Sequence, residues 1–307
     1  MAVKRPKLTI LIPVLLNGGT EAQTIQLVRA VSGAGALVSV CCYFESDTRT
    51  VEAVERAGSS VTQLGAGACG RRGSIGQLIR VGQMLYAHLV SSRPDFAHVQ
   101  YLAPGLLPIM AARAARVPVV FGTVHQVADA YGVRERLMLR LAASLCTAFF
   151  CVSRAVEESW FGESEVFDPE KHLLRRRHAT IYNGVDVGAY NLSVASAGAT
   201  SIRRELGLAD CPVVTVVGRL RWEKGQAVLV EAMSEVVRRV PGAALLVVGE
   251  GPDHGKLASQ VAAAGLADRI VWAGVRPIEE LPALYAISTV VVVPSVFEGF
   301  GLVAARW

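Results

Sequence analysis

The sequence lacks the features that would indicate a membrane-spanning or disulfide-stabilised protein. No apolar run approaches the roughly 18 residues that a membrane-spanning helix requires. The six cysteines include no C-x-x-C pair and no cluster with histidine at zinc-ligand spacing, so we expect them to be reduced residues of the core. We therefore predict a cytoplasmic protein.

The N-terminus resembles a signal peptide only superficially. Three basic residues precede the apolar run Leu8–Leu16, but no small-x-small cleavage site follows it. Pro13 and the polar turn after the run favour a first strand instead. The 307 residues suggest one large domain or two ordinary ones, and with 52% hydrophobic residues and a mean hydropathy of +0.39 the chain has enough apolar material for a core.

Positive charge is unevenly distributed along the chain. Residues 1–198 contain 20 basic and 15 acidic residues, whereas residues 199–307 contain 11 of each. Arg71-Arg72 and Arg175–Arg177 are the densest basic points. They are either solvated loop charges or part of a surface for an anionic lipid or acceptor at the inner face of the plasma membrane. Nucleic acid is not expected, because aromatic residues are not interleaved with the charges.

Apolar strand-like runs alternate with helix-length amphipathic segments along the first half of the chain. The runs are rich in Val, Ile and Leu with little polar alternation, which is typical of parallel strands covered on both faces. The predicted strands are 8–14, 36–43, 96–100, 118–124, 148–152 and 180–182, with helices at 21–32, 50–57, 75–91, 103–115 and 134–144.

The alternation restarts after a small, polar segment at 191–200, which we interpret as a linker. The second series predicts strands at 213–217, 244–248, 270–272 and 290–293, and helices at 226–239, 254–264 and 279–286. We predict an α/β protein with two Rossmann-like domains, 1–195 and 196–307, of which the second is incomplete at its C-terminus.

Two candidate binding points lie in the first domain. The first strand leads into Gly18 and Gly19 at a helix N-terminus, where backbone N–H groups can bind an anion. His125 follows the strand 118–124, so its imidazole is placed to hydrogen-bond a ligand. An ordinary strand-to-helix turn and a structural histidine are the simpler alternatives. The other five histidines are expected on the surface or in loops.

The second domain contains a stronger pattern of cations and glycine turns. Its first strand ends at Gly218-Arg219, and Lys224 follows five residues later. A bidentate guanidinium and a point-charge ammonium suit a diphosphate, although a solvated charge pair is the alternative. Gly249-Glu250 repeats the strand-to-glycine turn one unit later.

The final turn combines an acidic side chain with glycines. The run 290–293 leads through Pro294 to Glu298, and then through Phe300 and Gly301 into a helix-like segment. This is the carboxyl edge of a strand, where open α/β sheets bind ligands.

The ordered set of these motifs, with Asn183-Gly184-Val185-Asp186 between the domains, resembles the retaining GT-B glycosyltransferases of family four. The resemblance covers essentially the whole chain and implies transfer of a sugar from a nucleoside-diphosphate sugar to a glycan or lipid-linked acceptor, without a cofactor or bound metal. No D-x-D pair is placed to hold a metal. The resemblance assigns roles to ten residues: His125 and Glu298 would contact the sugar, and the donor would be bound by Gly18, Gly19, Arg219, Lys224, Gly249, Glu250, Phe300 and Gly301.

One position departs from the family pattern. The family has a second Glu eight residues after the first, but this sequence has Arg306 there and ends at Trp307. A cation cannot accept the hydrogen bonds of ribose hydroxyls. We therefore expect a C-terminally truncated chain with impaired activity. A non-catalytic protein that binds nucleotide or a partner, or a GT-B sugar-nucleotide epimerase, is the alternative.

Overall fold

The computed structural model describes residues 5–16, 18–66, 75–100, 105–172, 178–187, 199–208 and 210–306. The chain divides into two compact units, Met1–Gly184 (unit 1) and Val185–Trp307 (unit 2). The predicted boundary after residue 195 and most of the predicted linker lie outside the described residues. Only its last two residues are described, and they begin α9 (Ala199–Glu205).

Unit 1 is built on a seven-stranded parallel sheet with the order β3-β2-β1-β4-β5-β6-β7. Its strands are β1 (Lys7–Leu15), β2 (Leu37–Ser46), β3 (Ser59–Gln63), β4 (Phe96–Gln100), β5 (Val119–Val124), β6 (Ala148–Cys151) and β7 (His178–Thr180). β2 and β3 follow β1 on one side of the sheet, and β4 to β7 extend the sheet on the other side of β1. The strand order therefore reverses between β1 and β4.

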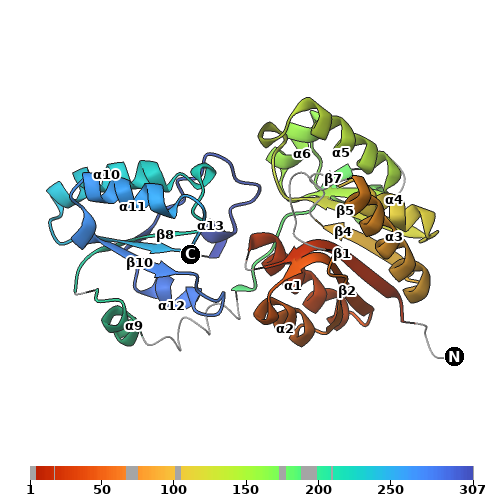
Figure 1. Cartoon of the computed structure of the whole chain (residues 1–307), viewed down its shortest axis with the longest axis horizontal. Coiled ribbons are helices and arrows are strands. Elements are labelled where there is room, and N and C mark those ends of the chain that lie inside the picture. The colour runs from red at the N-terminus through yellow and green to blue at the C-terminus, as the bar shows by residue number, and fades with distance from the viewer. Residues whose placement is uncertain are drawn as a thin grey trace. The chain divides into compact units, whose positions relative to one another are not determined.

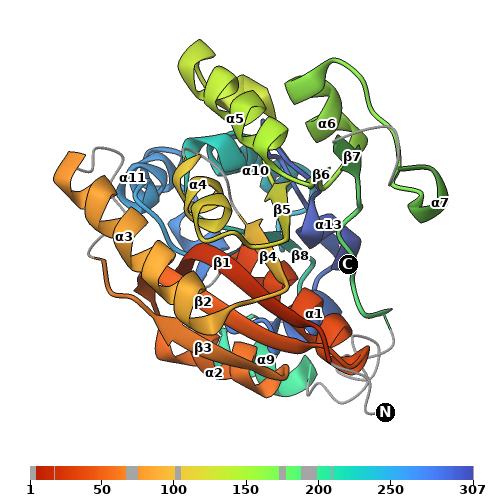
Figure 2. The same cartoon turned by 90° about the vertical axis from the view of Figure 1, so that its right-hand side faces the viewer.

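Two helical layers cover this sheet (Figures 1 and 2). α1 (Gly19–Gly33) and α2 (Thr48–Arg56) pack on one face, where Ile10, Val28 and Val40 belong to a buried apolar cluster. α3 (Ile75–Ser92), α4 (Leu107–Ala114) and α5 (Val133–Leu145) lie side by side on the other face. The other helices in the described part of unit 1 are η1 (Ala128–Ala130), α6 (Arg154–Phe161) and α7 (Pro169–His172).

Unit 2 contains a four-stranded parallel sheet with the order β10-β9-β8-β11. Its strands are β8 (Val213–Val217), β9 (Ala244–Val248), β10 (Ile270–Gly274) and β11 (Val290–Val291). Its further helices are η2 (Trp222–Lys224), α10 (Gln226–Arg239), α11 (His254–Ala263), η3 (Ala267–Arg269), α12 (Leu281–Ala286) and α13 (Leu302–Arg306). The strand order reverses between β8 and β11.

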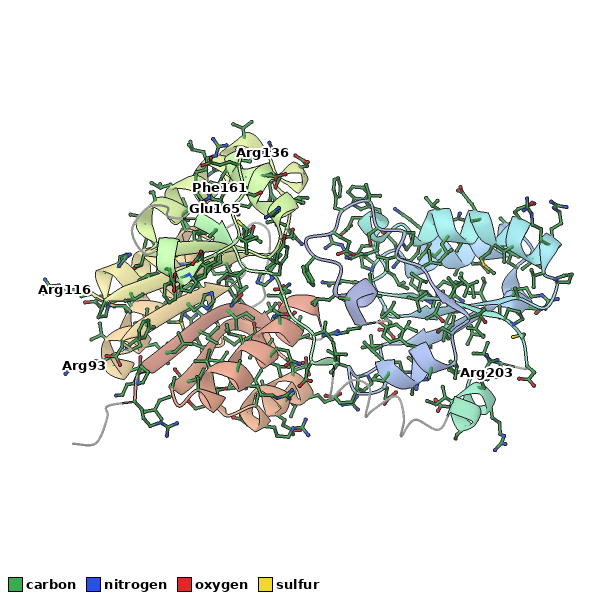
Figure 3. The ribbon with its side chains drawn as sticks, turned by 180° about the vertical axis from the view of Figure 1, so that it is seen from behind. Arg93, Arg116, Arg136, Phe161, Glu165 and Arg203 are labelled. Atoms are coloured by element: carbon green, nitrogen blue, oxygen red, sulfur yellow. The ribbon has the colours of Figure 1, made fainter. Side chains whose placement is uncertain are left out.

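Each face of the unit 2 sheet has its own apolar cluster. Met233 of α10 and Val261 of α11 are buried on one face, and Leu284 of α12 on the other. α9 lies against α12. Arg203 holds α9 in place by donating to the carbonyl oxygens of Cys211 at 3.1 Å and Ile287 at 2.9 Å (Figure 3).

The α/β architecture with parallel sheets confirms the predicted fold class, although several elements differ in detail. β3 was not predicted, because its half-exposed sequence SSVTQ has no apolar run. The helices α6 and α9 were also missed. The last strand of unit 1 is His178–Thr180 rather than 180–182, and β11 comprises two residues rather than four. Within the described residues, no helix is both long and apolar enough to cross a membrane.

Candidate functional site

The loops at the carboxyl edge of the unit 2 sheet interlock. Gly249 has φ +133, and a β-carbon there would overlap the carbonyl oxygen of Gly218. A β-carbon on Gly225, at φ +68, would overlap the carbonyl oxygen of Pro294. The backbone N–H of Leu220 donates to the carbonyl of Glu250 at 2.9 Å. Glycine is therefore required where the loops after β8, β9 and β11 meet, at the point where the strand order reverses.

Two of the predicted site residues are in direct contact. The ammonium of Lys224 donates to Oε1 of Glu298 at 2.6 Å, and the Ser295 hydroxyl donates to the same oxygen at 2.8 Å. Both charged side chains are half-buried, with exposed fractions of 30% and 32%. The residue predicted to bind diphosphate and the residue predicted to bind sugar therefore share one ion pair.

Arg219 is different from the neighbouring cations. Arg221 is paired with Glu223 at 3.1 Å, and Lys224 is paired with Glu298. The side chain of Arg219 is exposed and has no ion-pair partner among the described residues, although Gln226 holds its backbone carbonyl at 3.1 Å. This guanidinium is available to an anionic ligand.

The remaining predicted residues of unit 2 lie on the same loops. The side chain of Glu250, directly after β9, is exposed. Phe300 and Gly301 are half-buried, and Gly301, with φ +76, directly precedes α13. The structure therefore places them at one edge of the sheet, as the spacing of the motifs predicted; their roles toward a ligand stay predictions.

An aromatic pair in this region was missed by the sequence reasoning. The rings of Trp222 and Phe297 meet edge to face with centroids 5.8 Å apart, and Trp222 is 66% exposed. Both residues lie within the motifs that contain Lys224 and Glu298. The available sequence signal was a tryptophan in the charged segment Arg221-Trp222-Glu223-Lys224.

In unit 1, the glycine turn after β1 is occupied by an acidic side chain. Gly18 is the N-cap of α1 and has extended backbone geometry, so its position does not require a left-handed conformation. A β-carbon there would overlap the carboxylate of Glu21, whose side chain is buried. A phosphate approaching Gly18 and Gly19 would therefore meet this carboxylate, which lies in the first turn of the helix.

His125 belongs to a buried polar network at the same edge of the sheet. Its Nε2 is 2.7 Å from Oε1 of Gln100, and Nε2 of Gln100 is 3.4 Å from Nε2 of His98. The Thr123 hydroxyl completes the network at 2.7 Å from Nε2 of His98. These residues come from β4, β5 and the position after β5.

Burial keeps both histidines of this network neutral. It lowers the pKa of His98 to about 4, and burial together with the proximity of His98 lowers the pKa of His125 to about 3. The expectation that His98 lies on the surface or in a loop is therefore wrong: it is a buried residue of β4, 9% exposed. The polar alternation His98-Val99-Gln100 in an otherwise apolar strand was the missed signal.

His178, also expected on the surface or in a loop, is part of a second polar cluster. Its Nδ1 is 2.7 Å from the buried carboxylate of Glu157, which also accepts from the Thr180 hydroxyl at 2.6 Å and from the backbone N–H of Glu165 at 3.1 Å. These hydrogen bonds outweigh burial and lower the pKa of Glu157. The imidazole stacks on the ring of Phe161, with 4.1 Å between the ring centroids. This cluster joins α6 to β7, which is a structural role.

The two sites differ in chemistry. The edge of unit 2 offers the exposed guanidinium of Arg219, an ion pair and glycine turns, which suit an anionic ligand with hydroxyl groups. The edge of unit 1 offers a neutral imidazole. Among the described residues, no group of three or more His, Cys, Asp or Glu side chains is arranged to hold a metal ion.

The fold and these motifs define a glycosyltransferase of the GT-B class. The family model described as "Glycosyltransferase Family 4" matches residues 17–188, more than half of the chain, and that described as "Glycosyl transferases group 1" matches residues 199–305. The chain therefore belongs to glycosyltransferase family 4.

Characterised relatives match shorter segments. The chain is 41% identical over 101 residues to a GDP-mannose-dependent alpha-(1-6)-phosphatidylinositol monomannoside mannosyltransferase of Mycolicibacterium smegmatis, which is 33% of this chain and 26% of that protein. It is 39% identical over 126 residues to a D-inositol 3-phosphate glycosyltransferase of Segniliparus rotundus, or 39% of this chain and 27% of that protein. The matches thus span about a quarter of the relatives' length.

Solved structures resemble nearly all of the chain. Anabaena HepE, in complex with UDP and glucose, has a TM-score of 0.75 at 22% identity over 98% of this chain and 78% of that one. Sucrose-phosphate synthase from Thermosynechococcus elongatus has a TM-score of 0.73 at 19% identity, again over 98% and 78%. At these identities the likeness establishes the fold.

Proposed function

We propose that this protein transfers a glycosyl group from a nucleoside-diphosphate sugar to an acceptor. The observation that carries the proposal is the edge of unit 2, where the exposed guanidinium of Arg219 and the Lys224–Glu298 pair occupy interlocked glycine turns. Cations at this point would stabilise the departing diphosphate, and a carboxylate would accept hydrogen bonds from sugar hydroxyls. The role of His125 toward the sugar stays a prediction from the family resemblance, and the proposal invokes no bound metal.

The transfer is proposed to retain the anomeric configuration. Family membership supports this, since no carboxylate pair among the described residues dictates the stereochemistry. NMR of the first-formed product tests it, because the coupling of the anomeric proton distinguishes retention from inversion before the sugar mutarotates.

The acceptor is proposed to be a glycan or a lipid-linked molecule, approached from unit 1. The helices α3, α4 and α5 contain five arginines and one glutamate, whereas α1 and α2 are balanced. The same layer exposes large apolar side chains, among them Ile79 at 56%, Val133 at 85% and Leu137 at 69%. A cationic layer with protruding apolar residues suits the surface of an anionic membrane.

A second candidate is a non-catalytic protein that binds nucleotide. It is favoured by Arg306, which occupies the position of an acidic ribose ligand in the family pattern. Under this proposal, nucleoside diphosphates bind and no sugar is released or transferred.

One experiment separates the two candidates. The chain is titrated calorimetrically with UDP and GDP, and then incubated with UDP-glucose and GDP-mannose, the donors suggested by the relatives. Transferase activity predicts binding and slow release of nucleoside diphosphate, whereas the second candidate predicts binding alone. Absence of binding at millimolar nucleotide would contradict both.

A further inference from the structure

Gln226 is a buried glutamine that contacts the turn bearing Arg219. It is the first residue of α10, and 3% of its surface is exposed. Its amide nitrogen donates to the backbone carbonyl oxygen of Arg219 at 3.1 Å. A carbonyl oxygen only accepts, so the orientation of the amide follows from its partner. The side chain therefore reaches from the start of α10 back to the turn after β8.

The turn after β8 is also held by the backbone on both sides of Arg219. The N–H groups of Gly218 and Leu220 donate, each at 2.9 Å, to carbonyl oxygens at the end of β9 and in the turn after it. Gly218 has φ +153, and a glycine admits other backbone conformations at little cost. The carbonyl of Arg219 itself is held by Gln226, and this contact can be removed by substitution because a side chain makes it.

The two cations predicted to bind a diphosphate are located by different means. The ion pair with Glu298 holds the ammonium of Lys224 at 2.6 Å. The guanidinium of Arg219 is exposed and has no ion-pair partner among the described residues, so its location depends on its backbone. Gln226 follows Lys224 by two residues and is bonded to Arg219, so it directly links the two segments that carry the cations.

We propose that Gln226 is a positioning residue that sets the spacing between Arg219 and Lys224 for a diphosphate. Two cations bind a diphosphate tightly only when both reach its oxygens together. A guanidinium on a loose turn would lose conformational freedom on binding, which weakens the complex. By holding the Arg219 carbonyl, Gln226 orders the turn before the ligand arrives. This role rests on the proposed function, since it acts through the contact of Arg219 with the ligand.

The order of the turn can be measured without a ligand by hydrogen exchange at the amide of Leu220. Gln226→Met keeps a similar side-chain volume and removes the donor, so this amide should exchange roughly three- to tenfold faster. Gln260→Met is the matched control, because Gln260 also donates its amide to a backbone carbonyl of α10, that of Ala227 at 2.9 Å. The control should leave the exchange of Leu220 unchanged. Exchange in Gln226→Met equal to that of the unaltered protein would overturn the proposal.

A double-mutant cycle tests whether Gln226 acts through Arg219. The ligands are UDP and inorganic pyrophosphate, titrated calorimetrically. Gln226→Met should weaken both roughly three- to tenfold, the range of one neutral hydrogen bond. In the Arg219→Ala background, the same substitution should change either affinity by less than about twofold, because the guanidinium that it positions is absent. Gln260→Met should leave both affinities unchanged. An equal loss in the two backgrounds would show a merely structural role and overturn the proposal.

A second variant covers the case in which Gln226→Met does not fold. Gln226→Asn keeps the amide but draws it back by one methylene group from the Arg219 carbonyl, so the same faster exchange and weaker binding are expected. If both ligands bind and the cycle shows equal losses, the proposed function stands without this role of Gln226. If neither ligand binds the unaltered chain at millimolar concentration, the proposed function fails and the role toward a ligand fails with it, whereas the exchange of Leu220 still shows whether Gln226 holds the turn.

Discussion

Lys224 and Glu298 neutralise one another across 74 residues of sequence, with 2.6 Å between the ammonium nitrogen and the carboxylate oxygen. Before any ligand binds, the carboxylate holds the lysine at the edge of the sheet and the lysine screens the carboxylate. A diphosphate that approaches Lys224 must share it with Glu298. The predicted binding of diphosphate by Lys224 and of sugar by Glu298 is therefore interdependent, although the two residues lie in separate sequence motifs.

Removing Lys224 should harm diphosphate binding more than removing Arg219. Arg219→Ala should cost about 1.5–3 kcal/mol of UDP or GDP affinity, the value of a charge-assisted hydrogen bond. Lys224→Ala also leaves Glu298 uncompensated and repelling the ligand, so Lys224→Ala combined with Glu298→Gln should recover part of the loss. Calorimetry with diphosphate and with free nucleoside measures this, and Arg239→Ala, an exposed cation of α10, is the control. A double variant weaker than Lys224→Ala would contradict the shared pair.

Gly249→Ala should destabilise unit 2. The new methyl group overlaps the Gly218 carbonyl, and φ +133 is unfavourable for alanine, so we expect a loss of about 1–3 kcal/mol in unfolding free energy. Gly255→Ala is the matched control, since this helical glycine has nothing within 4 Å of an added β-carbon. The control should gain about 0.4–1 kcal/mol. Urea unfolding measures both, and equal effects would argue against the interlocked turns.

Stability should fall in mild acid because His98 is held neutral. Its pKa is about 4 in the folded protein, below the ordinary value of 6.5 that we expect in the unfolded chain, so the unfolded chain binds the extra proton. The loss begins as pH falls through about 6.5, grows by about 1.4 kcal/mol per pH unit, and levels off below the folded pKa. Between pH 7 and pH 5 it amounts to about 2 kcal/mol. In His98→Leu, the unfolding free energy measured with urea should fall correspondingly less between pH 7 and pH 5. A fall equal to that of the unaltered protein would refute the assignment of this pH dependence to His98.

Unit 1 should bind anionic vesicles through α5. Leu137→Glu adds negative charge to an exposed apolar position, so co-sedimentation with phosphatidylserine vesicles should decrease. Val228→Glu, a 62% exposed position on α10, should leave binding unchanged. Binding of the unaltered chain should weaken as salt rises, because exposed charges are screened over about 8–10 Å. Equal binding to neutral vesicles at all salt concentrations would contradict this.

Arg306→Glu should increase nucleotide affinity. The carboxylate could accept hydrogen bonds from ribose hydroxyls, which the arginine cannot, with an expected gain of up to about 1.5–3 kcal/mol. The gain should be present for UDP and absent for inorganic pyrophosphate, because pyrophosphate has no ribose. Calorimetry compares the two ligands, and a parallel gain for pyrophosphate would exclude a ribose contact.

The framework of the sheets was predictable because their strands are apolar and buried. The predicted bounds hold for Val213–Val217, Gln226–Arg239 and Ala244–Val248. A glycine follows each of the two strands, and the helix lies between Gly225 and Pro241. β3 escaped prediction because an edge strand with one covered side needs no apolar run. Its hydrogen bonds to β2, rather than its own side chains, hold it in the sheet.

The candidate site was predictable as a set of turns but not as a set of contacts. Strand-to-glycine junctions identify the carboxyl edge of a parallel sheet, so Gly218, Gly249 and Glu298 were found from local sequence. The ion pair of Glu298 with Lys224 depends on how two distant segments meet. The position of the Glu21 carboxylate against Gly18 depends on how the first turn of α1 folds back on its N-terminus. The contacts of Gln100 with His98 and His125 depend on the pairing of β4 with β5, which no local pattern of the sequence encodes.

The backbone overlaps at Gly225 and Gly249 have an evolutionary consequence. Three loops are locked together through atoms that no side-chain substitution can replace, so mutations cannot reshape one loop without disturbing the other two. Divergence toward a different donor is therefore confined to side chains that project from this rigid frame, such as Arg219, Trp222 and Glu250. A lineage can change what these residues recognise while inheriting the frame unaltered.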